Sequence, residues 1–276
     1  MSNNLSKLSK KEYPDSLYLR DLALSAGDIL LDHFHAGVEE NTKPDRTLVT
    51  VADTSVNDLV LKSLEKDFPH ISVLAEEGSR EVAGSEYRVI CDPLDGTTAF
   101  CVGIPFFSFC ISVVRGNTPL VAVILDPVMG RMWHATKMEG AFKGDQRLSV
   151  SRRRSLDGAK ISAVNLRGSP YNIQEARERL SELGVEIVSP QSIAYMGGLL
   201  AESRLDATVF GVQKCFETAA MQLIVEEAGG RATDLRGNRL EYGPQGEVQG
   251  HIISNGLIHN EIVEVVALVQ NCSECS

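Results

Sequence analysis

Apolar residues recur at helical spacing in the first quarter of the chain. Over residues 15–34 they fall every three or four positions, which predicts an amphipathic helix that Gly37 can end. The same spacing over residues 53–68, with Pro69 just beyond, predicts a second helix. Asp53 stands where this second helix begins. A plain helix-capping role for Asp53 is therefore an open alternative to any chemical role.

Two short apolar runs predict strands that each lead directly into carboxylates. Residues 71–75 run into Glu76, and residues 89–91 run into Asp92 and Asp95. If the two strand ends lie side by side, these three acids come within ligand range of divalent cations. A solvated acidic turn is the competing interpretation of Glu76.

The segment after Asp92 combines turn-forming residues with hydrogen-bond donors. Pro93 has no N–H, so the strand is expected to leave the sheet there, and Gly96 permits a sharp turn. Thr97 and Thr98 supply hydroxyl and N–H groups that can face an anion where a helix begins. A cation beside an anion-binding turn suits a phosphate ester. The alternative is a plain surface turn, which Asp-Pro and Asp-Gly pairs often form.

The remaining pattern divides the chain in two. An antiparallel meander with a hairpin at 140–145 is followed by alternating strands and helices, and the polar, basic segment 149–158 separates them. We therefore expect residues 1–150 to form an N-terminal α+β half with the metal-binding motifs, and residues 151–276 a C-terminal α/β half. Together they would make one compact catalytic unit. The predicted strands are residues 106–114, 120–125, 131–135, 160–164, 185–188, 206–210 and 251–254, and the predicted helices are 172–183, 193–203, 216–228 and 260–270.

Composition narrows the class of protein. The 276 residues are 43% hydrophobic and 23% charged, which is typical of a globular protein. The formal net charge of −10 provides no general attraction for a nucleic acid polymer or an anionic membrane. No stretch approaches the roughly 18 apolar residues of a membrane span, and residues 1–11 lack the apolar core of a signal peptide. We expect a cytoplasmic protein.

Several motifs together resemble one family. Asp-Pro-Leu-Asp-Gly-Thr-Thr at residues 92–98 follows Asp53 and Glu76, and an acid precedes Ala-Ala far downstream at residues 219–220. Their joint order, over nearly the whole chain, resembles the inositol monophosphatase family of magnesium-dependent, lithium-sensitive phosphatases. The resemblance implies a mixed α/β fold, a layered αβαβα sandwich of the inositol monophosphatase and fructose-1,6-bisphosphatase type. It also implies a site between the halves and a homodimer.

The resemblance assigns the metal ligands. Glu76, Asp92 and the carbonyl of Leu94 would hold one Mg²⁺, with Mn²⁺ as an alternative ion. Asp92, Asp95 and Glu217 would hold a second. The family usually has Trp-Asp where this chain has Phe216 and Glu217, so this ligand is one methylene longer than usual.

The resemblance also assigns the catalytic and substrate-binding residues. Thr97 and Asp53 would orient and deprotonate a metal-bound water, beside Glu76, for attack on phosphorus. The substrate contacts would be Gly96, Thr97, Thr98 and Ser192.

The leading hypothesis is therefore a metal-dependent phosphatase that hydrolyses a phosphate monoester of a small polar metabolite. Phe210 stands where inositol-cleaving members place a hydroxyl-binding carboxylate, and Thr98 stands where the bisphosphate nucleotidases usually carry Lys. Thr98-Ala-Phe and Gly-Ile-Pro at 103–105 resemble the histidinol-phosphatase branch more closely. Histidinol phosphate and a 3'(2'),5'-bisphosphate nucleotide are the alternative substrates. A member that binds a phosphorylated ligand without hydrolysing it is a third possibility, which Glu217 motivates.

Overall fold

A computed structural model of the protein describes residues 11–37, 40–42, 48–164 and 173–273. The helices are α1 (Ser16–Ala36), α2 (Val51–Asp67), α3 (Thr97–Cys101), α4 (Gln174–Glu182), α5 (Ile193–Ala201), α6 (Thr218–Glu227) and α7 (His259–Ser273). A short antiparallel ribbon pairs β1 (Glu40–Thr42) with β2 (Leu48–Thr50).

Two larger sheets form the frame of the molecule. The first has the order β3-β4-β5-β6-β7-β8-β9 and the second the order β11-β10-β12-β14-β13. The strands of the first are β3 (Ser72–Ala75), β4 (Tyr87–Asp95), β5 (Ser108–Arg115), β6 (Thr118–Asp126), β7 (Arg131–Thr136), β8 (Gly140–Lys143) and β9 (Gln146–Arg147). Those of the second are β10 (Lys160–Val164), β11 (Glu186–Val188), β12 (Ala207–Phe210), β13 (Arg231–Thr233) and β14 (His251–Ser254).

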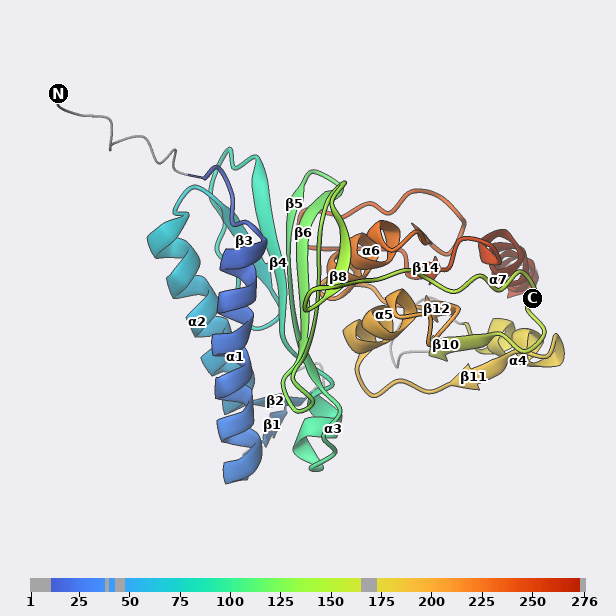
Figure 1. Cartoon of the computed structure of the whole chain (residues 1–276), viewed down its shortest axis with the longest axis horizontal. Coiled ribbons are helices and arrows are strands. Elements are labelled where there is room, and N and C mark those ends of the chain that lie inside the picture. The colour runs from blue at the N-terminus through green and yellow to red at the C-terminus, as the bar shows by residue number, and fades with distance from the viewer. Residues whose placement is uncertain (1–10, 38–39, 43–47, 165–172, 274–276) are drawn as a thin grey trace.

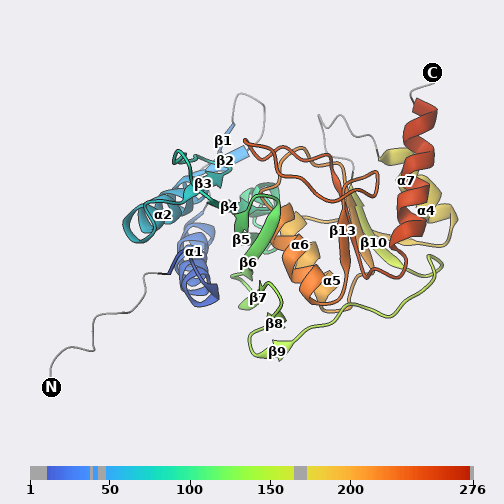
Figure 2. The ribbon, with the colours of Figure 1, turned by 90° about the horizontal axis from the view of Figure 1, so that it is seen from above.

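Helices and sheets alternate in five layers (Figures 1 and 2). Helices α1 and α2 cover the outer face of the first sheet, α5 and α6 lie between the sheets, and α4 and α7 cover the outer face of the second. Three hydrophobic cores fill the spaces between these layers. Leu30 belongs to the first core, Trp133 and Met221 to the middle one, and Ile252 to the last. The predicted αβαβα sandwich is confirmed.

The periodic elements are those expected from the sequence, with shifts at their ends. The meander β5 to β7 is antiparallel throughout, and α1 ends at Gly37 as predicted. The helix predicted from Asn172 begins at Gln174, with Ile173 as its N-cap; residue 172 lies outside the described residues, as do residues 1–10. Strands β1, β2 and β13 were not predicted. Each spans three residues, too few for an alternating pattern to register.

The prediction that the chain leaves the sheet at Pro93 is wrong. Strand β4 continues to Asp95, and its register against β5 shifts between Asp92 and Asp95. Such a bulge accommodates a proline, because the missing N–H falls where the ladder is already interrupted. The two acids therefore lie on the strand itself rather than on a loop beyond it.

The segment between the two sheets is tied to the second sheet. Ser151 donates to the Oδ1 of Asp206, and Asn255 donates to Ser151 and to the carbonyl of Arg153. These bonds hold an otherwise irregular stretch of chain. The division of the chain at residue 150 into two halves stays a prediction.

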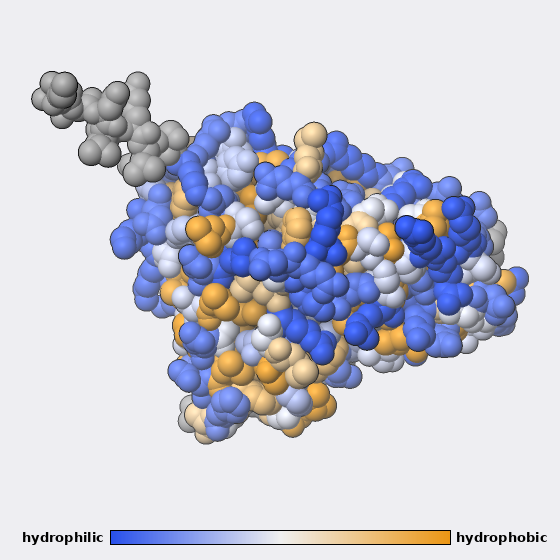
Figure 3. Space-filling view, in the orientation of Figure 1, coloured by the Kyte–Doolittle hydropathy of each residue, from blue (hydrophilic) through white to orange (hydrophobic). Residues whose placement is uncertain are grey.

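Apolar side chains are exposed near α3. Val51, Val102 and Ile104 are 44%, 66% and 42% exposed. Figure 3 shows hydrophobic residues gathered over this lower edge of the molecule. Within the described residues, no helix has the combined length and apolar character that crossing a membrane requires.

Candidate active site

Three carboxylates from distant parts of the chain meet at one end of the middle layer. One oxygen each from Asp92, Asp95 and Glu217 lies within 4.8 Å of the other two. Asp92 and Asp95 come from β4, and Glu217 is the residue immediately before α6. Because α6 packs between the sheets, its first residues reach the end of β4. The structure thus brings together three of the predicted metal ligands.

The environment of these acids disfavours their ionised forms. Burial is the main cause that raises the pKa of Asp92 and of Glu217, and the negative charges of Glu76 and of the neighbouring acids raise both pKa values further. A buried group of like charges requires protons or a cation. Carboxylate oxygens are the donors that Mg²⁺ and Mn²⁺ prefer, so the residues present fit a hard divalent ion.

Asp95 is held by hydrogen bonds from β5 and from the start of α5. Its Oδ2 accepts hydrogen bonds from the backbone N–H of Ala194 at 2.7 Å, the Ser192 hydroxyl at 2.5 Å and the Ser108 hydroxyl at 3.3 Å. Burial raises the pKa of Asp95, while the bonds from Ser192 and Ala194 lower it. Asp95 thereby keeps more acidic character than burial alone would allow.

Ser192 lies beneath Asp95 rather than on an open surface. Its side chain is buried, donates to Asp95 and caps α5 by accepting from the N–H of Tyr195 at 3.4 Å. These bonds occupy the hydroxyl that was expected to contact the substrate. The structure therefore favours an indirect role for Ser192, through Asp95.

Asp53 is a buried partner of a helix cap. Thr50 is the N-cap of α2, so the alternative that Asp53 is the N-cap is wrong. Asp53 instead takes part in the cap as the third residue of the helix. The Oδ2 of Asp53 accepts from the N–H of Thr50 at 2.7 Å and from its hydroxyl at 2.6 Å, which forms a capping box. Burial raises the pKa of Asp53, the Thr50 bonds lower it, and the charge of Glu76 raises it.

Glu76 lies at the end of β3, which runs parallel to β4. Ala75 is opposite Cys91, and the N–H of Glu76 donates to the Cys91 carbonyl at 3.3 Å. The expectation that the two strand ends lie side by side is confirmed. Glu76 itself is exposed, and among the described residues it is outside the three-acid group. Its charge nevertheless acts on all three acids of that group.

The turn from Leu94 to Thr98 orders the backbone beside the acids. The N–H of Leu94 donates to the Oδ1 of Asp92 at 2.9 Å, and the Thr97 hydroxyl donates to the Leu94 carbonyl at 3.0 Å. Gly96 has φ +94° and precedes α3, and the Thr98 side chain is exposed. Thr97 thus points at the carbonyl that was predicted as a ligand.

The backbone at Gly96 is closely packed. A Cβ there would lie 3.0 Å from the carbonyl oxygen of Gln191 and 3.2 Å from that of Phe106. Both the left-handed φ and this close approach require glycine.

Two residues of this region were missed in the sequence. Thr50 could have been found, since Thr-x-x-Asp at residues 50–53 is a variant of the capping-box pattern. Ser108, which bonds both Asp95 and Ser192, lies in an apolar strand and has no local signal.

Comparison with known proteins agrees with this fold. A sequence model described as "Inositol monophosphatase family" matches residues 16–271, so the chain belongs to the inositol monophosphatase family. The resemblance drawn from the motifs is confirmed.

The relatives carry several functional names. The chain is 34% identical over 234 residues to a histidinol-phosphatase of Mycobacterium tuberculosis, covering 81% of this chain and 86% of that protein. It is 32% identical to a fructose-1,6-bisphosphatase/inositol-1-monophosphatase of Thermotoga maritima, covering 89% and 93%. Among solved structures, the extragenic suppressor protein SuhB of Bartonella henselae has a TM-score of 0.80 at 28% identity, covering 90% of this chain and 96% of that one.

Proposed function

We propose that this member of the family hydrolyses a phosphate monoester of a small polar metabolite, with a divalent metal ion as cofactor. The observation that carries the proposal is the group formed by buried Asp92 and Asp95 with half-buried Glu217, one oxygen of each lying within 4.8 Å of the other two. Such a group is costly without a cation, and phosphoryl transfer needs positive charge beside the phosphate.

The ligand assignment follows the positions of the side chains. Asp92, Asp95 and Glu217 would hold one Mg²⁺ or Mn²⁺, and Glu76 with Asp92 and the Leu94 carbonyl a second. When bound, such ions lower the pKa of a coordinated water and neutralise phosphoryl charge. The Leu94 carbonyl is kept in place by the Thr97 hydroxyl.

The remaining residues act on water and on the phosphate. Asp53, whose pKa is raised by burial, is a base for the proton of the attacking water, and Thr97 orients that water. The N–H groups of Gly96, Thr97 and Thr98 would hold phosphate oxygens. Ser192 contributes by fixing Asp95.

The test is phosphate release from a generic phosphate ester by the purified protein with Mg²⁺ or Mn²⁺. Asp92→Asn is expected to abolish release while the protein stays folded. Asp58→Asn, an exposed change on α2, is the matched control and should retain the wild-type rate. Normal turnover by Asp92→Asn would contradict the proposal.

Histidinol phosphate is the first substrate to test. Relatives named histidinol-phosphatase from Mycobacterium tuberculosis and Streptomyces coelicolor are 34% and 30% identical to this chain. Phe210 is buried against His251, with ring centroids 5.2 Å apart, so it offers no hydroxyl-binding carboxylate to an inositol ring. The specificity constant, kcat/KM, should be highest for histidinol phosphate among it, inositol 1-phosphate, fructose 1,6-bisphosphate and a 3',5'-bisphosphate nucleotide. A preference for any of the other three esters would contradict this assignment.

A non-catalytic member is the second candidate. Some relatives are named Nus factor SuhB, including one of Pseudomonas aeruginosa that is 30% identical to this chain. Glu217 and Phe216, where the family usually has Trp-Asp, favour it. Calorimetry that detects binding of a phosphate ester, together with no phosphate release under any divalent ion, would support this candidate over the enzyme.

We further propose a cytoplasmic homodimer. The exposed apolar residues Val102 and Ile104 near α3 support an assembly. Sedimentation equilibrium should give twice the chain mass, and Val102→Asp should shift it toward the monomer. A monomer at all concentrations would contradict the homodimer. Fractionation of the source cells tests the location.

A further inference from the structure

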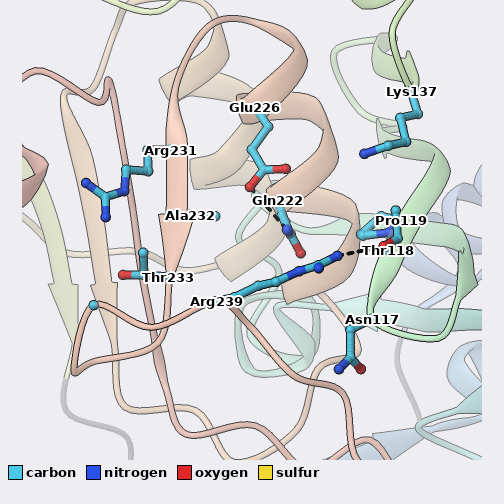
Figure 4. A pocket seen from close by; sticks show the side chains of 11 residues that line it. Asn117, Thr118, Pro119, Lys137, Gln222, Glu226, Arg231, Ala232, Thr233 and Arg239 are labelled. Atoms are coloured by element: carbon cyan, nitrogen blue, oxygen red, sulfur yellow. Dashed lines mark hydrogen bonds between the residues drawn. The ribbon is translucent and has the colours of Figure 1, made fainter.

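A separate polar pocket lies at the opposite end of α6 from Glu217. Its volume is about 340 Å³. It is formed by the turn before β6, the end of β7, the second half of α6, β13 and the loop after it (Figure 4). The lining residues used below are Thr118, Lys137, Gln222, Glu226, Arg231 and Arg239.

One wall of the pocket carries a carboxylate that is fixed in place. The Nε2 of Gln222 donates to the Oε1 of Glu226 at 3.1 Å, and the Tyr242 hydroxyl donates to the Oε1 of Gln222. Both Gln222 and Tyr242 are buried. Figure 4 shows the Glu226 carboxylate directed into the open space of the pocket. Glu226, the single acid of the lining, is therefore fixed by hydrogen bonds that run through the buried side chains of Gln222 and Tyr242.

Two cations also line the pocket, Lys137 opposite Glu226 and Arg239 along the floor (Figure 4). The guanidinium of Arg239 donates to the Thr118 hydroxyl at 2.7 Å, which holds it across the pocket floor. The amine of Lys137 makes no hydrogen bond or ion pair with any residue that the structure describes, and Figure 4 shows it extending toward Glu226. Burial raises the pKa of Glu226, whereas the Gln222 hydrogen bond and the positive charges of Lys137 and Arg239 act to lower it.

Arg231 also borders the pocket, but it does not take part in this arrangement. It donates to the Oδ1 of Asn260 at 2.8 Å, and in Figure 4 its guanidinium points away from Glu226. The charges that face the pocket are thus two positive and one negative.

The geometry points to a small zwitterion as the ligand. We propose that the pocket binds a free α-amino acid, whose carboxylate would bind Lys137 and Arg239 and whose ammonium would bind Glu226. A phosphate or dicarboxylate ligand would neutralise the cations but would place negative charge against Glu226. A zwitterion pairs with both signs of charge at once, and this complementarity favours it over an anion that Glu226 would repel.

The pocket is independent of the phosphatase site. Glu217 and Glu226 lie at opposite ends of α6, and nine helical steps correspond to about 14 Å. Changes at Glu226, Lys137 or Arg239 therefore leave the candidate metal ligands untouched. Failure of this inference and failure of the proposed phosphatase activity are separate outcomes.

The test is binding of the standard L-amino acids, each screened by thermal shift on the full chain and then measured by calorimetry. For the tightest binder, the deaminated acid and the decarboxylated amine are measured as well. Each should bind at least about tenfold more weakly, since one ion pair of about 1.4 kcal/mol is lost. Glu226→Gln should remove the preference for the amino acid over its deaminated acid.

The control variant is Arg236→Ala, which changes an exposed arginine in the same loop but outside the pocket lining. It should bind as the wild type does, whereas Lys137→Ala should weaken binding. Four outcomes would overturn the inference. These are binding by none of the amino acids, equal binding by Lys137→Ala and wild type, an unchanged preference in Glu226→Gln, and tighter binding of succinate or inorganic phosphate than of any amino acid.

Discussion

The Oδ2 of Asp95 lies 2.7 Å from the backbone nitrogen of Ala194, which donates a hydrogen bond to it across 99 positions of the chain. Asp95 belongs to the first sheet, and Ala194 to the first turn of α5 between the sheets. The unpaired N–H groups at a helix start favour a negative charge. A candidate metal ligand therefore also joins the first sheet to helix α5 of the middle layer, so the site and the fold cannot be altered independently at this residue.

Ser192→Ala should move the acid limb of the pH–activity profile to higher pH. The Ser192 hydroxyl lowers the pKa of Asp95, so its loss raises that pKa and Asp95 becomes protonated at a higher pH. Loss of the cap on α5 should also cost about 0.5–2 kcal/mol of unfolding free energy. Ser192→Thr, which keeps a hydroxyl, should restore the profile. A profile that does not move in Ser192→Ala would contradict the role of this bond.

Asp92→Asn should raise the melting temperature of the metal-free protein. The pKa of Asp92 is raised by burial and by the charges of Glu76 and Glu217, so the ionised group destabilises the fold near neutral pH. Asparagine removes that charge and still accepts from the N–H of Leu94.

The same variant should lose most of its response to metal. Mg²⁺ at about a hundred times its Kd should stabilise the wild type by about 2.7 kcal/mol. Melting curves with and without Mg²⁺ measure both effects. If Mg²⁺ raises the melting temperature of the variant as much as that of the wild type, Asp92 is ruled out as a ligand.

Glu217→Asp should weaken metal binding. Glu217 reaches Asp92 and Asp95 from the residue before α6, and α6 is held there by the bond between Thr218 and His251 at 3.0 Å. Because the helix is fixed, a side chain shorter by one methylene cannot follow the ion. The half-saturating Mg²⁺ concentration in the phosphatase assay should rise at least tenfold. A lower half-saturating Mg²⁺ concentration in Glu217→Asp would mean that the native glutamate fits the ion less well than an aspartate does.

Gly96→Ala should destabilise the protein by about 1–3 kcal/mol and reduce its activity, because it adds both strain and crowding. Gly103 is the matched control, since its φ of +76° is also left-handed but no atom lies within 4 Å of an added Cβ. Gly103→Ala therefore measures strain alone. Urea unfolding of both variants should show the larger loss for Gly96→Ala, and equal losses would exclude a contribution from crowding.

Two buried histidines should make stability depend on pH. Burial lowers the pKa of His251 from its ordinary value of 6.5 to about 3 and that of His259 to about 4. The unfolded chain binds more protons than the folded one between these values, so their contribution is complete above pH 6.5 and is lost as the pH falls toward 4. Each histidine contributes a slope of up to about 1.4 kcal/mol per pH unit.

Urea unfolding at a series of pH values measures this slope. His251→Gln should reduce the slope below pH 6.5, whereas the same change at exposed His35 should not. An unchanged slope in His251→Gln would show that His251 does not titrate as its burial implies. Comparing variant with wild type cancels the opposite contribution of the buried acids.

Local rules predicted some features of this protein and failed at others for identifiable reasons. The helix over 15–34 and the meander were predictable because their apolar spacing is repeated over many residues. The continuation of β4 past Pro93 was not, because a bulge depends on the partner strand β5. The cap of α2 was predictable in principle from Thr50 and Asp53, whose bond is local.

The sequence by itself determined which residues are candidate oxygen ligands, where most helices and strands form, and to which family the chain belongs. Only the tertiary structure decided that Glu217 lies beside Asp92 and Asp95, and that the Ser192 hydroxyl donates a hydrogen bond to Asp95. The physical reason is that spacing along the chain reports on neighbours within a turn or a strand. Contacts between distant residues depend on how the sheets and the helices between them pack.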